Sequence, residues 1–590
     1  MDYAKLSPTL VAALTDFDLG GRPALAAHAR TLGLVSTEAA AKPPRVVVFV
    51  HCDEGVDSGD LAGDGVEINQ PAGGVRTGIV DLAALDRLTE NPAVSRIVPA
   101  RRLRLLMDVA KPKVGIPAFR RTNNLSGAGV VIGIVDTGIE ADHPAFAGRI
   151  LRVWDQTMAG PGVAEGGYGA ELQPPMIEIS RDTAGHGTHV AGIAAADDPV
   201  YEGVAPGADL VIVKSDLLTA HIADGVRYIL RVAEELGRPA VVNLSLGGHG
   251  DAHDGTDSLS MVIDSLTGPG RIVCCAAGNE GNDNIHAQGK VRKGGVRTFS
   301  ASIPRPIAGQ RPWVAAFNGW YRGKDRMTVR VIAPDHEATP AQAVIEGNEN
   351  PATIYELEQG AVRVTTPGPD PANGDINFFV EIQPAPAPAP PEGAPPSPPS
   401  PPGTWRIQMR GVKVSGPGLV DVWSIDEGVG QFTGRAVEDN MKVGAPGACT
   451  SAITVASFTT KSAWEDFFGN PHESGLELNT ISDFSSEGPR RDGVEKPDVA
   501  APGAMIGASL SGDSGVGAAV LLDQLNRINA GTSMACPFVA GLVALLLERD
   551  PTLDPDKIKD ALKAKSAIPR QPRGTFDEKW GYGLISAKAL

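Results

Sequence analysis

Cysteine is scarce in this sequence, which has five among 590 residues, an odd number. The five lie in largely apolar stretches, and no two of them form a CxxC pair. Small disulfide-stapled domains carry a denser, even set, and structural zinc sites usually use paired cysteines. The sequence therefore predicts no disulfide framework and no metal site, and it favours buried thiols in a reducing compartment.

Basic charge and long apolar runs are also lacking. The formal net charge is −17 at pH 7, whereas nucleic acid and anionic membranes attract a basic surface. No uninterrupted apolar stretch reaches transmembrane length. Residues 1–27 show no basic segment followed by an apolar one, so no standard secretory signal is visible. We expect a cytoplasmic protein with no nucleic-acid or membrane partner, and non-standard secretion stays open.

One segment near the C-terminus is present in a form that suggests chemistry. Gly531-Thr532-Ser533-Met534-Ala535-Cys536-Pro537 precedes a wholly apolar run, Phe538 to Leu547. A run that is apolar all round predicts a buried helix, with Ser533 at its start. There the outward backbone N–H groups could stabilise an oxyanion formed by attack of the Ser hydroxyl. Taken alone, a Ser at a helix start is more often only an N-cap.

Buried strands alternating with helices predict an α/β fold with a doubly wound parallel sheet at residues 116–290 and 440–590. Apolar strands at 130–135 and 271–277 end on Asp136 and on Gly278-Asn279. In open parallel sheets, chemistry collects beyond the carboxyl ends of the strands. We expect Asp136 and Asn279 to lie at that edge.

Two further domains are predicted on either side of the first catalytic segment. Residues 43–115, after a lead-in at 1–42, read as a small α+β unit with strands at 46–50 and 94–98. Residues 291–439 contain short alternating segments without helical periodicity, which predicts an inserted all-β sandwich. Its segment 384–402 is mostly proline and predicts a solvated polyproline loop, more often a spacer than a PxxP partner site.

Three residues from distant segments could together form a catalytic triad. The segment Gly185-His186-Gly187-Thr188-His189 places a His between glycines at the start of an apolar helix. Asp136 could accept from one nitrogen of this His, and Ser533 could donate to the other. A Ser hydroxyl needs such a base, held in the correct tautomer by a carboxylate, because it attacks poorly by itself. The order Asp, His, Ser is the order found in subtilisin.

At these residues the sequence resembles the subtilisin-like (S8) serine peptidases. The matching segments are Asp136-Thr137-Gly138, His186 to Gly192, Ser245-Leu246-Gly247-Gly248, Ala277 to Gly281 and Gly531 to Ala535. The resemblance covers about 120–290 and 440–590. It implies a serine endopeptidase that acts on proteins or peptides through an acyl-enzyme.

The resemblance also assigns roles to individual residues. Asp136 would orient His186, His186 would act as general base and then acid, and Ser533 would be the nucleophile. Asn279 would supply the side-chain oxyanion donor beside the Ser533 backbone N–H. The pocket for the residue before the scissile bond (S1) would be formed by Ser245, Leu246, Gly247 and Gly248 on one side and by Ala276, Ala277 and Gly278 on the other.

Some positions depart from the family pattern. Many subtilisins bind a tight calcium ion on a long loop after the catalytic His, but here 196–203 is short, and Ala145 follows His143-Pro144 where the family has Asp. We expect no required cofactor and a weak calcium site at most, with Asp197 and Asp198 as turn residues. Cys536 lies three residues after Ser533, which suggests sensitivity to bulky mercurials.

By the same resemblance, residues 43–115 would be a ferredoxin-like inhibitor prodomain, and 291–439 a jelly-roll-like insertion. The chain would autoprocess between Arg104 and Asn123, and its own prodomain would be an inhibitory partner. Two alternatives stay open: a catalytically silent relative that binds or signals, and a protease that acts only on itself in cis. The four residues Asp136, His186, Asn279 and Ser533 are all present, which favours the enzyme.

Overall fold

The computed structural model describes residues 1–24, 34–35, 44–100, 104–105, 113–306, 313–347, 349–387, 403–425 and 429–590. The chain divides into two compact units. The first contains residues 1–101, 249–252 and 283–439, and the second contains 102–248, 253–282 and 440–590. Most of the polyproline segment predicted at 384–402 lies outside the described residues.

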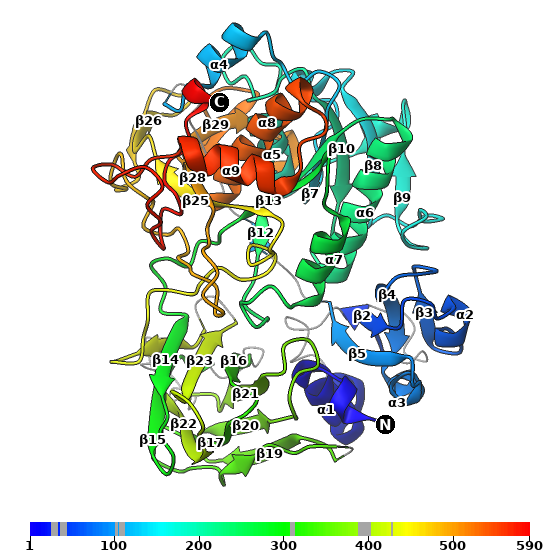
Figure 1. Cartoon of the computed structure of the whole chain (residues 1–590), viewed down its shortest axis with the longest axis vertical. Coiled ribbons are helices and arrows are strands. Elements are labelled where there is room, and N and C mark those ends of the chain that lie inside the picture. The colour runs from blue at the N-terminus through cyan, green and yellow to red at the C-terminus, as the bar shows by residue number, and fades with distance from the viewer. Residues whose placement is uncertain are drawn as a thin grey trace, which may run out of the picture. The chain divides into compact units, whose positions relative to one another are not determined.

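The second unit is built on an eight-stranded sheet whose order is β28-β25-β13-β11-β7-β10-β8-β9 (Figure 1). All neighbouring pairs are parallel except β8 with β9. This order confirms the predicted α/β fold. The later strands β11, β13, β25 and β28 follow one another on one side of β7, and β8, β9 and β10 lie on the other, so β7 lies at the switch point where ligands bind in such sheets. The strands are β7 (Val131–Asp136), β8 (Ile150–Asp155), β9 (Ala170–Leu172), β10 (Asp209–Lys214), β11 (Ala240–Leu244), β13 (Arg271–Ala276), β25 (Ile453–Thr459) and β28 (Val499–Ala504).

Helices cover both faces of this sheet. The helices α5 (His186–Ala195) and α8 (Thr532–Arg549) pack on one face, where Ile132 and Ile134 of β7 point. On the other face lies α6 (Thr219–Glu235), with α7 (Ser258–Leu266) beside it. Gly133 permits this packing, because a Cβ atom there would lie 2.3 Å from Cγ2 of Ile229 on α6.

Helix α8 is the buried helix that the sequence predicts. It begins at Thr532, one residue before Ser533, and is buried from Thr532 to Leu547. Its length and hydropathy would let it cross a membrane, but 89% of the apolar window lies inside the protein. Its apolar surface is therefore satisfied by the sheet and by α5.

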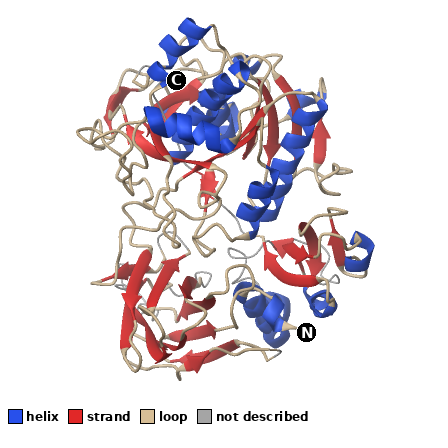
Figure 2. Cartoon of the chain, in the orientation of Figure 1, coloured by secondary structure: helices blue, strands red, loops and turns tan. Residues whose placement is uncertain are grey.

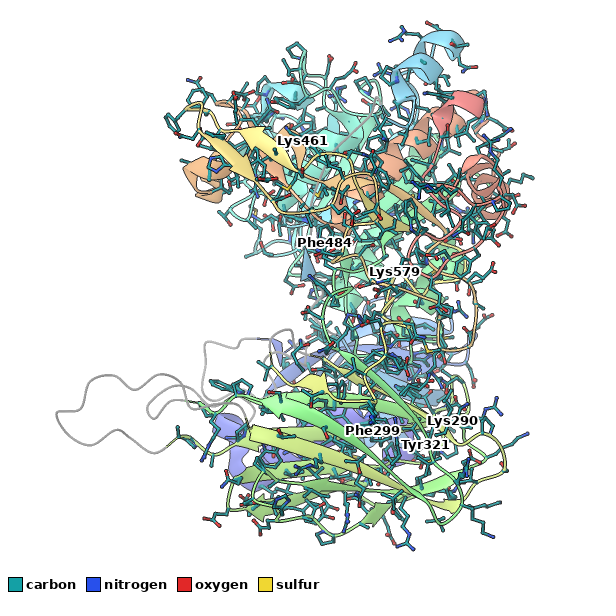
Figure 3. The ribbon with its side chains drawn as sticks, turned by 90° about the vertical axis from the view of Figure 1, so that its left-hand side faces the viewer. Lys290, Phe299, Tyr321, Lys461, Phe484 and Lys579 are labelled. Atoms are coloured by element: carbon teal, nitrogen blue, oxygen red, sulfur yellow. The ribbon has the colours of Figure 1, made fainter. Side chains whose placement is uncertain are left out.

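Residues 283–439 of the first unit form a sandwich of two antiparallel sheets. One sheet has the order β14-β23-β16-β21-β20-β19 and the other β18-β17-β22-β15-β24. Figure 2 shows strands and no helix in the described part of this segment. Phe299 and Tyr321 belong to the core between the sheets, together with Trp405 (Figure 3). The longest strands are β15 (Val296–Ile303), β16 (Ala315–Tyr321), β17 (Arg326–Ile332), β21 (Ile376–Pro384) and β22 (Gly403–Lys413).

The same unit contains a small N-terminal domain. Its antiparallel strands β5-β2-β4-β3 follow the order expected of a ferredoxin-like sheet, although the helix after β2 is only the four residues of α2 (Ser58–Leu61). Residues 1–42 were predicted to be a lead-in outside this domain. Instead they contain α1 (Pro8–Ala24), which packs Leu10 and Leu14 into the domain's core. The main elements are β2 (Arg45–Cys52), β3 (Val66–Ile68), β4 (Val75–Asp81), α3 (Leu85–Glu90) and β5 (Val94–Pro99).

Candidate active site

An Asp–His pair forms at the carboxyl end of the central strand. Asp136 is the last residue of β7 and is fully buried, and His186 is the first residue of α5. Nδ1 of His186 lies 2.7 Å from Oδ1 of Asp136. An ionised carboxylate can only accept, so this contact places the proton on Nδ1 and leaves Nε2 as the basic nitrogen.

Local contacts hold these two residues in register. The backbone N–H of Thr137 also donates to Oδ1 of Asp136, at 2.7 Å. The Thr137 hydroxyl in turn accepts from the N–H of Gly187 at 3.0 Å, which ties the first turn of α5 to the end of β7. Gly187 allows this approach, since a Cβ atom there would lie 2.2 Å from the carbonyl oxygen of Gly138. The glycine after His186 is therefore a packing requirement.

Ser533 lies in the first turn of α8 and is fully buried. Its hydroxyl donates to the carbonyl oxygen of Ser245 at 2.9 Å. In return the Ser245 hydroxyl donates to the Ser533 carbonyl at 2.6 Å and accepts from the Asn243 amide at 2.9 Å. This reciprocal pair fixes the start of α8 against the end of β11.

The side-chain amide of Asn279 is oriented by Thr532. Oδ1 of Asn279 accepts from the Thr532 backbone N–H at 3.0 Å and from its hydroxyl at 3.1 Å. The Thr532 hydroxyl also accepts from the N–H of Gly278 at 3.2 Å. Because both bonds go to the oxygen of the planar amide, Nδ2 of Asn279 points away from Thr532 as a donor. The structure thus brings Asn279 beside the helix turn that bears Ser533.

The predicted S1 residues line the chain ends beside these groups. Ser245 follows β11, and Leu246 and Gly247 form the short strand β12. Ala276 ends β13, and Ala277 is held there by donating to the Val455 carbonyl at 3.1 Å. The strand β6 (Arg104–Leu105) pairs antiparallel with β12, with Leu105 opposite Leu246 and Arg104 opposite Gly247. The edge of β12 therefore binds an extended backbone segment.

A third wall of this region was not predicted from the sequence. The N–H of Gly248 donates to the Ala445 carbonyl at 3.0 Å, and a Cβ atom on Gly447 would lie 2.9 Å from the Ala276 oxygen. The segment 443–447 therefore lies between the two predicted walls. Its small residues and the Ala445-Pro446 dipeptide were a usable signal, but only the pairing with Gly248 identifies its place.

Two residues near the proposed triad, His189 and Cys536, are buried in environments that keep them out of the proposed chemistry. Nε2 of His189 lies 3.1 Å from the Arg527 carbonyl, and complete burial lowers the pKa of His189 well below its usual value. Cys536 is also fully buried, and burial raises the pKa of its thiol well above the usual value. A neutral His and a protonated thiol take no part in proton transfer or nucleophilic attack at neutral pH.

Asp198, which was expected to be a turn residue, and Glu280, the neighbour of Asn279, both accept local hydrogen bonds. Oδ1 of Asp198 accepts from the N–H groups of Val200 and Tyr201, at 2.8 and 2.6 Å, as in a turn. Oε2 of Glu280 accepts from the Asn279 N–H at 2.7 Å and from the Ser486 hydroxyl at 2.9 Å. Over the described residues, no cluster of three or more His, Cys, Asp or Glu side chains is arranged to hold a metal ion.

Comparison with known proteins finds a family model and relatives that are all subtilases. The model of the subtilase family, peptidase S8, matches residues 127–303 and 422–583. Subtilisin-like protease PopC of Myxococcus xanthus is 33% identical over 190 residues, which are 29% of this chain and 37% of that protein. Subtilisin-like protease SBT1.4 of Arabidopsis thaliana is 25% identical over 504 residues, 75% of this chain and 58% of its own length. The chain thus spans less than two thirds of these relatives.

A solved structure shows the same fold over most of the chain. The CspB protease of Clostridium perfringens superposes with a TM-score of 0.64 and 24% sequence identity. The match covers 81% of this chain and 97% of that protein.

Proposed function

The chain belongs to the subtilase family of serine peptidases, and on that premise we propose that it is a serine endopeptidase that hydrolyses peptide bonds of proteins. The observation that carries the proposal is the 2.7 Å contact between His186 and the buried Asp136. The same edge of the sheet presents Ser533 and the oriented amide of Asn279.

The proposed reaction uses these groups in both of its half-cycles. Ser533 Oγ attacks the scissile carbonyl carbon after its hydroxyl turns from Ser245 toward His186, whose Nε2 takes the proton. Nδ2 of Asn279 and the Ser533 N–H stabilise the oxyanion. His186 then gives the proton to the leaving amine, the C–N bond breaks, and an acyl-enzyme forms. Water then attacks the acyl carbon while His186 takes its proton, and His186 gives this proton to Ser533 Oγ as the ester bond breaks and the acid leaves. These steps need no cofactor, and a weak calcium site stays a prediction.

The chain's own N-terminal domain is proposed as an inhibitor that is removed by self-cleavage. Support comes from the pairing of Arg104–Leu105 with β12, the edge on which a substrate backbone would lie. Ile116 and Phe119 are buried in the helix α4 (Ile116–Asn123), so cleavage inside that helix would require it to unfold. We therefore narrow the proposed processing site from 104–123 to the segment between residues 105 and 116.

A casein assay tests the function directly. We expect the purified chain to degrade casein, and we expect Ser533→Ala and phenylmethylsulfonyl fluoride each to abolish this activity. Ser265→Ala on α7, on the opposite face of the sheet, is the matched control. Self-cleavage without casein cleavage would favour a protease active only in cis. If neither occurs, the chain is a catalytically silent binding protein and the proposal fails.

The state of the cysteines indicates the redox character of the compartment in which the protein works. All five are free and buried, which supports the proposal that the protein works in a reducing, cytoplasmic environment. Fractionation of cells that produce the protein tests this directly: recovery of the active chain mainly outside the cytoplasm would contradict it.

A further inference from the structure

Two phenylalanines are exposed side by side on the catalytic unit. They lie at the turn between β26 (Ala463–Glu465) and β27 (Pro471–Glu473), a hairpin that follows β25. Phe467 is 45% exposed and Phe468 67% exposed, and their rings pack edge to face with centroids 5.3 Å apart. Adjacent exposed aromatic rings are costly in water and are enriched at binding surfaces. We call Phe467 and Phe468 the aromatic tip.

The tip is held in a defined shape. Oδ1 of Asp466 accepts from the N–H groups of Phe468 and Asn470, both at 2.9 Å, and Oδ2 contacts Nε2 of His472 at 2.9 Å. The His472 ring stacks on Trp464 with centroids 5.5 Å apart. A loop with so many internal bonds loses little conformational entropy when it binds a partner. The aromatic tip is therefore presented to solvent by a preorganised scaffold.

The hairpin is attached to the loop that leads to the nucleophile. This loop joins β29 (Ile506–Ser509) to β30 (Asn526–Asn529), and β30 ends four residues before Ser533. The Phe467 N–H donates to the Leu521 carbonyl at 2.8 Å, and Nε1 of Trp464 donates to the Ala519 carbonyl at 2.9 Å. The tip is thus fixed to the loop that precedes β30 and Ser533.

The chain that leaves the hairpin also returns to the site. After β27 it reaches Phe484, whose carbonyl accepts from the Gly281 N–H at 2.8 Å. Two residues later the Ser486 hydroxyl accepts from the Glu280 N–H at 3.0 Å, next to the oxyanion residue Asn279. In Figure 3, Lys461 marks the approach to the hairpin and Phe484 the return. The segment that follows the hairpin is therefore anchored beside the proposed oxyanion residue.

The location of these anchors indicates which part of a substrate the tip would meet. The edge of β12 pairs with the backbone of β6, and in the proposed reaction the acyl part of a substrate would pair there in the same way. The leaving amine must take its proton from His186, and the β29–β30 loop lies against that residue's neighbour: a Cβ atom on Gly185 would be 2.6 Å from Cβ of Ser514. The leaving part of the polypeptide would therefore run past His186, along this loop and toward the hairpin.

We propose that the aromatic tip binds apolar side chains of the substrate on the C-terminal side of the scissile bond. This proposal rests on the proposed peptidase activity and adds a specificity determinant to it. The chemistry of the surface selects the partner: two rings, with the nearby Asp466 carboxylate already engaged by four donor groups, favour aliphatic or aromatic side chains over charged ones.

The test compares substrates that differ only beyond the scissile bond. One is a peptide p-nitroanilide, which has no residues on the leaving side. The others are internally quenched peptides with the same acyl residues, followed by either Leu-Phe-Leu or Ser-Gly-Ser. We expect Phe467→Ser combined with Phe468→Ser to lower kcat/KM about 5–30-fold on the apolar peptide and to leave the anilide unchanged. Val200→Ser, at a position 72% exposed in the same unit, is the matched control.

Other outcomes overturn the proposal. An equal loss on all substrates would show that the hairpin only supports the catalytic loop, and no loss would show that the tip does not contact substrate. A change of sedimentation in the double variant would identify a self-association surface instead. If the wild type cleaves nothing, the peptidase proposal fails separately. Fluorescence polarisation then tests the tip without turnover. The Ser533→Ala chain should bind the labelled apolar peptide, and the variant that also carries Phe467→Ser and Phe468→Ser should not.

Discussion

At the scale of single residues, Thr532 links the proposed nucleophile, Ser533, to the proposed oxyanion donor, Asn279. Its backbone N–H and its hydroxyl both donate to Oδ1 of Asn279, and its hydroxyl also accepts from Gly278. The Thr532 side chain therefore fixes both the plane of the Asn279 amide and the backbone of Gly278 before it. In the proposed mechanism Thr532 would be a positioning residue, since it would act on the reaction through Asn279.

Removal of the oxyanion amide should affect turnover more than binding. We expect Asn279→Ala to lower kcat by about 10²–10³-fold, the order known for the oxyanion amide in subtilisin, with little change in KM. Thr532→Val should give a smaller loss of about tenfold, because the backbone N–H still holds the amide. Thr532→Ser retains the hydroxyl and serves as control. Steady-state kinetics on a peptide anilide measure all three, and a loss confined to KM would contradict the assignment.

The Cys536 thiol should react slowly with mercurials. The sequence position suggested sensitivity, but the side chain has no exposed surface and its pKa is raised by burial. We expect the activity to survive brief treatment with p-chloromercuribenzoate, and Cys536→Ala to respond like the wild type. Rapid inactivation that Cys536→Ala prevents would show that the site opens enough to admit the reagent.

At the scale of elements, close packing of α5 on the end of β7 positions His186. Gly187 is the contact point, because a Cβ atom there would lie 2.2 Å from the Gly138 carbonyl and 3.1 Å from Cβ of Asp136. A helix cannot yield at one residue without moving its neighbours. The geometry of the Asp136–His186 pair thus depends on a glycine that takes no part in chemistry.

Gly187→Ala should therefore lower activity by displacing His186. We expect kcat to fall at least about tenfold with KM little changed, because small misplacements of a catalytic group are costly. Gly192→Ala on the same helix, where a Cβ atom would meet Ser509 at 2.7 Å, is the comparison. It should cost stability, measured by thermal unfolding, and less activity. Equal kinetics in both variants would remove the positioning argument.

A second link between elements joins β28 to the C-terminal helix α9 (Pro555–Lys565). Asp498 is buried between Lys496, at 2.7 Å, and Lys563, at 3.1 Å. Burial alone would raise the pKa of Asp498, but the charges of Lys496, Lys563 and Lys559 outweigh it, and the net shift is downward. A lowered carboxyl pKa stabilises the fold above the unfolded value, near 4, and this contribution disappears as pH falls through the folded pKa.

Asp498→Asn should destabilise the second unit at neutral pH. We expect a loss of about 3 kcal/mol at pH 7, because the lysines would be left without their buried partner. The difference from the wild type should shrink as pH falls below about 4. Urea unfolding at several pH values measures this. Asp556→Asn, whose carboxylate is 91% exposed, should stay within about 0.5 kcal/mol; a difference independent of pH would contradict the charge argument.

At the scale of the whole molecule, the N-terminal domain and the inserted sandwich form one compact unit. Nη2 of Arg96 lies 2.6 Å from Oδ2 of Asp370, and both side chains are nearly buried. On the sandwich, Arg363 pairs with Asp16 of α1, and Nδ2 of Asn350 donates to the Thr15 hydroxyl at 3.1 Å. The domain that self-cleavage would detach is therefore held by contacts remote from the cut.

A cut between residues 105 and 116 should leave the N-terminal fragment bound. We expect it to co-elute with the remainder in gel filtration of a Ser533→Ala chain that carries an inserted site for a specific protease. Asp370→Lys should promote release, since it places two cations together in a poorly solvated contact. Asp335→Lys, in an exposed turn of the sandwich, is the control. Release without any substitution would mean that the covalent link alone retains the fragment.

The sequence by itself predicted the candidate catalytic residues and the α/β fold, and the sheet order confirms the fold. This was possible because the signals are local: glycines beside His186, a polar residue where a strand ends, and an apolar run after Ser533. Tertiary structure alone decided which way the Asn279 amide points, that segment 443–447 lies beside Gly248 and Ala276, and that α1 belongs to the N-terminal core. These features depend on backbone groups that are far apart in the chain and that only folding brings within hydrogen-bond or packing distance.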